Sequence, residues 1–121
     1  MERSHVLGLM CGYYLSRFDG GAYDSLHLGN KTQTHAAIAR ALGVPPLSLK
    51  NWRDEFDPAH ENSRQGWHNR EMRASRVKAI AILSRYSQEE IHGWVTGCID
   101  DPNGPDAQKV LDLLGGLEPA G

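Results

Sequence analysis

The chain has 121 residues, of which 40% are hydrophobic and 23% are charged, and its 13 Lys and Arg against 15 Asp and Glu give a formal net charge of −2. This length and composition are ordinary for one soluble globular domain and exclude a disordered chain. No uncharged apolar run approaches the roughly 18–20 residues of a membrane span, so we expect no membrane partner.

The cysteines and the first residues bear on the compartment. Cys11 and Cys98 are the two cysteines, and no C-x-x-C pair is present. This excludes both a disulfide framework and a Cys-rich zinc module. The opening residues lack the basic segment and small-residue cleavage site of a secretory signal, so we expect a cytoplasmic protein.

Charge is distributed unevenly along the chain. Residues 31–78 contain nine Lys and Arg against five Asp and Glu, a net charge of +4, and the remaining residues carry −6. A basic centre between acidic flanks is typical of contact with a polyanion. Chance clustering on a solvated surface is the alternative.

The first predicted elements are helical. Ser4 is a candidate cap for a helix through Phe18, because apolar residues recur there at three- and four-residue spacing. Gly20 and Gly21 are predicted to end this helix, since glycine adopts the left-handed conformation that closes helices. A short helical turn is predicted over residues 22–28.

Two helices are predicted around a glycine. Asn30 followed by Gln33 resembles a capping box, and a helix over residues 33–42 is expected to stop at Gly43. Proline fits the first turn of a helix, so the next helix is predicted to begin at Pro46 and to end near Phe56.

Residues 57–73 are polar and aperiodic, and three helices are predicted after them. The first covers residues 74–86. Ser87 with Glu90 forms a capping box that opens the second, which continues through Cys98. A turn over residues 101–105 precedes the last helix, over residues 106–114.

The spacing around Gly43 is that of a helix-turn-helix. Ala39 supplies the small residue where two helices cross, Gly43 tolerates a positive φ in the turn, and Leu49 returns an apolar side chain to the core. An ordinary corner between two helices is the alternative. The remaining inward positions hold Ile38, Leu42, Val44 and Trp52.

The predicted fold class is therefore all-α, a compact bundle of about five to six helices containing a helix-turn-helix. We expect residues 1–100 to form a DNA-binding domain. Residues 101–121 are expected to form a C-terminal helix and the start of a linker.

The second helix of this motif places its N-terminal residues at base edges in the major groove. Asn51 suits adenine, Lys50 suits guanine or phosphate, and Ser48 suits either base or backbone. Asp54, at the rim, and Glu55 are unfavourable there, because carboxylates repel phosphate, and pairing with Arg53 or the later arginines is the alternative for them. Further contacts are predicted from Thr32 and Thr34, which suit phosphate, and from Arg53 on the flank.

Residues 64–78 contain five basic side chains, a density that suits clamping of a DNA backbone. Trp67 is a candidate for stacking on a base, with burial in the core as the alternative. Arg76 and Lys78 lie at a helix start, where a cation opposes the helix dipole, so an anionic partner would explain them. The predicted DNA contacts in this segment are Arg64, Trp67, His68, Arg70, Arg73, Arg76 and Lys78.

Two alternatives belong to other functional classes. A small metal-dependent nuclease is one, because a single loop holds the metal-ligand types Asp57, His60, Glu61 and His68. Their spacing matches neither H-E-x-x-H nor a zinc-finger pattern, and the ββα-metal context of an HNH nuclease is lacking. A protein–protein or dimerisation adaptor is the other, supported by the acidic flanks and by apolar residues from Val110 to Leu114. Nothing in the sequence requires catalysis, and we expect no metal, no cofactor and no enzyme activity from this chain alone.

Several phrases resemble an N-terminal helical module of bacterial restriction and defence proteins, including modification-dependent nucleases. The phrases include Tyr14-Leu-Ser-Arg-Phe-Asp19, Lys50-Asn-Trp-Arg-Asp-Glu-Phe-Asp-Pro58 and Asn62-x-Arg-x-Gly-Trp67, within a resemblance that covers about residues 13–95. It implies binding of double-stranded DNA, with sensing of a modified base or backbone, and a nuclease domain elsewhere in the full protein. Trp52 and His68 depart from the pattern. Neither the target site nor the oligomeric state follows, and a homodimer is compatible.

Overall fold

The computed structural model describes residues 2–60 and 72–117, and every regular element in these ranges is helical. This confirms the all-α prediction, although the described ranges hold seven α-helices rather than five or six. The elements are α1 (Arg3–Phe18), α2 (Gly20–Leu26), α3 (Lys31–Leu42), α4 (Pro46–Phe56), the 3₁₀ turn η1 (Asp57–Ala59), α5 (Ala74–Leu83), α6 (Gln88–Asp100), α7 (Pro105–Leu114) and the 3₁₀ turn η2 (Gly115–Leu117).

The junction between α1 and α2 differs from the prediction. Asp19, rather than the following glycines, breaks the helix, with φ 44° and ψ −123°. Its carbonyl accepts hydrogen bonds from the N–H groups of Ala22 and Tyr23, so a new helix begins at once. Gly20 and Gly21 therefore occupy the first turn of α2 instead of terminating α1.

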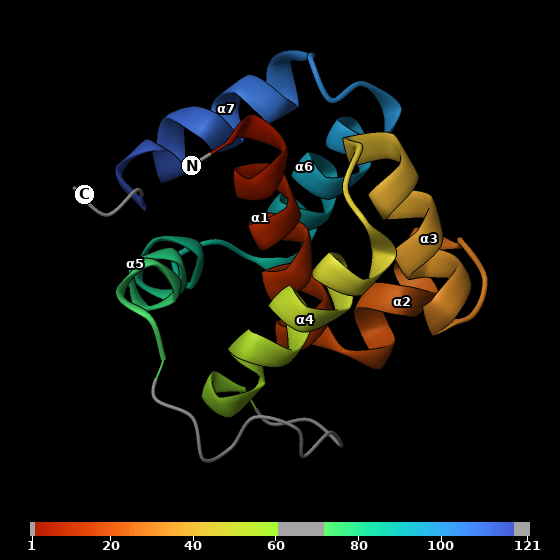
Figure 1. The fold of residues 1–121 in the computed structure, drawn as a ribbon, viewed down its shortest axis with the longest axis horizontal. Coiled ribbons are helices and arrows are strands. Elements are labelled where there is room, and N and C mark those ends of the chain that lie inside the picture. The colour runs from red at the N-terminus through yellow and green to blue at the C-terminus, as the bar shows by residue number, and fades with distance from the viewer. Residues whose placement is uncertain (1, 61–71, 118–121) are drawn as a thin grey trace.

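Helix α1 is the centre of the molecule and contacts every other α-helix of the described ranges. All of residues 6–16 are buried, as expected for a helix that is apolar around its whole circumference. In Figure 1, α4 crosses in front of α1, with α3 on the right of the view and α5 on the left. No helix within residues 2–60 and 72–117 is both long and apolar enough to span a membrane.

Two glycines allow α4 to lie close to α1. A Cβ placed on Gly8 would overlap the ring of Trp52, and one on Gly12 would lie 3.0 Å from the backbone nitrogen of Arg53. Only a residue without a side chain fits at such a crossing. Glycines at positions i and i+4 of α1 thus determine where α4 packs.

The connection between α3 and α4 follows the predicted local rules. Asn30 and Gln33 form the capping box of α3, and Gly43 has the left-handed φ of 75° that ends it. Pro46 occupies the first turn of α4. The predicted start and end of α4 are confirmed.

The C-terminal half completes the same core. Helix α5 ends at Leu83, three residues earlier than predicted, and the Ser87–Glu90 capping box opens α6. Helix α7 packs against α1 and α6 and buries Val110 and Leu114 between them. The C-terminal helix is therefore part of the bundle.

Candidate nucleic-acid interface

Helix α4 has one buried and one exposed face. Leu49 and Phe56 are fully buried against the core, whereas Leu47, Lys50 and Asn51 are exposed and Ser48 is half-buried. Positions 47, 50 and 51 recur at the helical repeat, so they line one stripe on the outside of α4. We call Leu47, Ser48, Lys50 and Asn51 the outer stripe.

A layer of polar side chains lies beneath α4. The Arg53 guanidinium donates hydrogen bonds to Asp54 Oδ1, at 2.8 and 3.1 Å, and to the hydroxyl of Tyr23, at 3.0 Å. Tyr23 is in turn bonded to His35 Nε2, at 2.6 Å, so α2, α3 and α4 are joined. Arg53 is only 5% exposed. It lies inside the fold rather than on a DNA-facing flank, contrary to the prediction.

Asp54 also differs from its predicted place at the rim. Burial raises the pKa of this carboxyl, but hydrogen bonds from Arg53 and Lys50 outweigh burial and hold the pKa below its ordinary value. Lys50 Nζ lies 3.1 Å from Asp54 Oδ2, while about half of the Lys50 side chain remains exposed. The negative charge that seemed unfavourable for DNA contact is therefore neutralised by neighbouring cations.

The two threonines at the start of α3 differ in exposure. Thr32 is exposed, as a phosphate contact requires. Thr34 is fully buried, and its hydroxyl donates a hydrogen bond to the carbonyl of Gly29, at 3.4 Å. Its predicted place on the surface is wrong, because the hydroxyl is used within the turn that precedes α3.

The three described cations near the start of α5 also differ in exposure. Arg76 is 3% exposed and donates two hydrogen bonds to the Glu55 carboxylate, at 2.9 and 3.2 Å, which joins α5 to α4. Arg76 is therefore not on the surface as predicted, and its pairing with Glu55 is the alternative that the sequence offered for this carboxylate. Arg73 is 65% exposed and lies 3.6 Å from Glu55, and Lys78 is also exposed. The predicted contacts Arg64, Trp67, His68 and Arg70 lie outside the described residues.

The outer stripe is flanked on two sides. Helix α3, which carries Thr32, packs against α4, and Figure 1 shows α5, which carries Lys78 and begins directly after Arg73, on the other side of α4. Two exposed residues near this surface were not predicted as contacts: Arg40, a cation in the last turn of α3, and Leu47. The exposure of Leu47 could have been predicted, because it lies in the first turn of the predicted helix and is not one of the positions that were expected to face inward.

Two of the residues considered for a nuclease, Asp57 and His60, lie against Ser16 of α1. Ser16 Oγ donates a hydrogen bond to Asp57 Oδ1, at 2.7 Å, and lies 2.9 Å from His60 Nδ1. Ser16 and Asp57 are both fully buried, so the hydroxyl is closed to substrate. Within the described ranges no group of three or more His, Cys, Asp or Glu is placed to hold a metal ion, and Glu61 and His68 lie outside those ranges.

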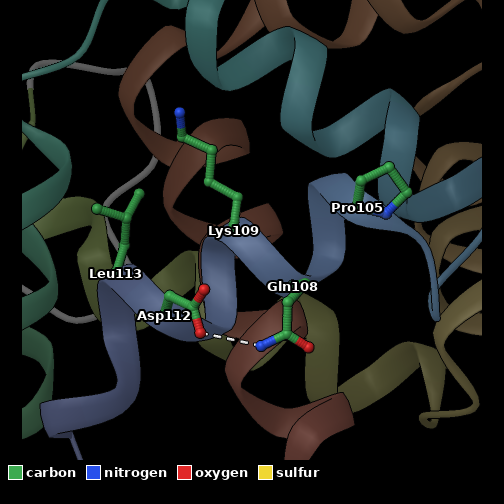
Figure 2. A pocket seen from close by; sticks show the side chains of 5 residues that line it. All are labelled: Pro105, Gln108, Lys109, Asp112 and Leu113. Carbon is green, nitrogen blue, oxygen red and sulfur yellow. Dashed lines mark hydrogen bonds between the residues drawn. The ribbon is translucent and has the colours of Figure 1, made fainter.

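The adaptor alternative depended on the apolar residues of α7. Val110 and Leu114 are buried in the core of this same chain, so they do not form a free face. The outside of α7 holds a shallow groove, shown in Figure 2, in which Gln108 donates a hydrogen bond to Asp112 at 2.9 Å. The lining residues are Pro105, Gln108, Lys109, Asp112 and Leu113.

Comparison of the chain with protein-family models, with curated proteins and with solved structures found no match. The function is therefore inferred from the chemistry and placement of the side chains described above.

Proposed function

We propose that α3 and α4 work as a helix-turn-helix that binds double-stranded DNA, with α4 in the major groove. The observation that carries this proposal is the outer stripe. Helix α4 buries one face on α1 and leaves exposed, near its N-terminus, the side chains that contact base edges in such motifs. An amide, an ammonium group and a hydroxyl lie together there, on Asn51, Lys50 and Ser48.

The exposed side chains are expected to contact two parts of the DNA, the base edges and the phosphate backbone. Asn51 hydrogen-bonds adenine through two atoms, and Lys50 contacts guanine or a phosphate. The phosphate contacts come from exposed residues of α3 and from the start of α5, namely Thr32, Arg40, Arg73 and Lys78. The buried cations Arg53 and Arg76 support this surface from inside and take no part in the contact.

The resemblance noted in the sequence adds a context to this proposal. In that context the chain is the DNA-recognition part of a larger cytoplasmic restriction-type enzyme, and a separate nuclease domain cuts the DNA. Binding to plain, methylated and phosphorothioated duplexes tests whether the chain senses a modification.

A salt series with duplex DNA tests the central proposal. We expect affinity to fall steeply with salt, because each phosphate contact releases counterions and adds about −0.9 to the slope of log K against log salt. Lys50→Ala is expected to weaken binding about tenfold, by loss of one charged contact. The matched control is Lys109→Ala, which removes an exposed lysine from α7 and is expected to bind like the parent.

Two results contradict the proposal. One is affinity that does not change with salt, which indicates apolar docking to a protein instead. The other is equal loss of affinity in Lys50→Ala and Lys109→Ala, which indicates contact through overall charge rather than through α4.

A further inference from the structure

The outer stripe contains an exposed apolar side chain. Leu47 is 65% exposed and Val77 is 52% exposed, and they are the exposed large hydrophobic residues of the described ranges. Val77 lies on α5, whereas Leu47 lies in the first turn of α4, beside the polar groups of the outer stripe. Leu47 is not part of the hydrophobic core that the described residues form.

Leu47 and Asn51 are neighbours on the surface of α4. Side chains four positions apart on a helix lie on one face, with Cβ atoms about 5–6 Å from each other. That separation allows both to reach the same base pair or two adjacent ones, since base pairs are stacked about 3.4 Å apart. A leucine and an asparagine thus face the major groove together.

The major-groove edge of an A·T pair offers a partner to Leu47 and another to Asn51. Thymine presents a C5-methyl group, which suits apolar contact, and adenine presents the N6 donor and N7 acceptor that an asparagine amide pairs with. A G·C pair offers neither, and its cytosine carries a methyl at C5 only when modified. We propose that Leu47 contacts the C5-methyl of thymine while Asn51 bonds adenine, so that α4 selects A·T pairs.

This inference rests on the proposed DNA binding and is tested with alternating duplexes of one length, which need no known target. Adenine–thymine is compared with adenine–uracil, which differs only by the C5-methyl group. Burying one methyl predicts about fourfold weaker binding of the parent to the uracil duplex. Leu47→Ala is expected to bind the two equally, because its short side chain does not reach the methyl.

Val77→Ala is the matched control, since it also shortens an exposed aliphatic side chain. It is expected to keep the parent's preference for thymine. Because Leu47 is exposed and alanine favours helix, Leu47→Ala is expected to unfold at the same urea concentration as the parent. A loss of the preference for thymine in Leu47→Ala is then not caused by a loss of folding.

Guanine–cytosine duplexes, with and without C5-methylated cytosine, distinguish the source of the methyl. We expect both to bind more weakly than adenine–thymine, by about tenfold, because Asn51 loses its adenine. Methylated guanine–cytosine bound as tightly as adenine–thymine would overturn the assignment to A·T pairs. So would a parent that binds thymine and uracil duplexes equally while binding remains salt-dependent, a result that leaves the proposed DNA binding intact.

Discussion

The two faces of α4 use similar side chains for different purposes. On the inner side, Arg53 is nearly inaccessible and its guanidinium is bonded to Asp54 and to Tyr23. On the outer side, Lys50 extends into solvent and lies near the same Asp54. Both are cations of one short helix, yet one holds the fold together and the other is available to a partner.

The same division occurs where α5 begins. Arg76 is buried and forms an ion pair with Glu55. Arg73, three residues earlier, lies near the same carboxylate but is mostly exposed. A basic segment in a sequence therefore mixes cations that stabilise the bundle with cations that form its surface. Substitutions on the two sides are expected to affect different measurements, and this difference can be tested.

The largest effect is expected from Arg53→Ala. The substitution leaves the Asp54 carboxylate and the Tyr23 hydroxyl buried without the guanidinium, and loss of one partner of such a pair costs about 3 kcal/mol of unfolding free energy. Lys50→Ala, which removes an exposed cation from the same carboxylate, is expected to cost no more than about 0.5 kcal/mol. Urea unfolding of the two variants measures the difference. Equal stabilities would show that the division between inner and outer face is wrong.

A smaller loss is expected from Gly12→Ala, which tests how closely α4 lies on α1. The added Cβ would lie 3.0 Å from the backbone of α4, which cannot rotate away as a side chain can. Overpacking is expected to cost about 1–3 kcal/mol, less the gain of about 1 kcal/mol that alanine brings to a helix.

Gly93→Ala is the control for this substitution. Gly93 is exposed within α6, and a Cβ there meets nothing within 4 Å. Only the gain in helix propensity remains, so we expect it to stabilise the chain by about 0.5–1 kcal/mol. If thermal unfolding shows Gly12→Ala to be as stable as Gly93→Ala, the close crossing of α1 and α4 is contradicted.

The contrast between Gly12 and Gly93 shows which features of this fold follow from sequence. Capping boxes, the left-handed Gly43 and the proline start of α4 are set by a few consecutive residues, and all three are confirmed. Helix α2 was predicted only as a short helical turn over residues 22–28, because the positive φ was expected at the glycines and is found at Asp19. Two glycines four apart in an apolar helix indicate a close crossing, but not which helix makes it.

The candidate site was also predictable only where a few consecutive residues determine it. The exposed positions of α4 follow from the helical repeat, so Lys50 and Asn51 lie outside as predicted. Arg53 bonds the adjacent Asp54, but its second partner Tyr23 and the Glu55 partner of Arg76 are remote in sequence and approach only in the folded bundle. No local pattern distinguishes a cation with such a partner from one without.

The smallest effect concerns His5, whose ring stacks on Trp52 with centroids 4.7 Å apart. Burial lowers the pKa of this histidine from its ordinary 6.5, and the positive charge of Arg76 lowers it further. Its buried Nε2 has no hydrogen-bond partner among the described residues, which also favours the neutral ring. The folded state therefore binds this proton less readily than the unfolded state does.

The sign of the pH dependence follows from that difference. Above the unfolded pKa of 6.5 the ring is neutral in both states, and the folded state carries no penalty. As the pH falls below this value the unfolded state takes up the proton first, so the free energy of unfolding decreases. Urea unfolding at about pH 7.5 and about pH 5.5 is expected to show a larger loss for the parent than for His5→Gln, which has no titrating ring. An equal loss in the two proteins would show that groups other than His5 cause the acid sensitivity.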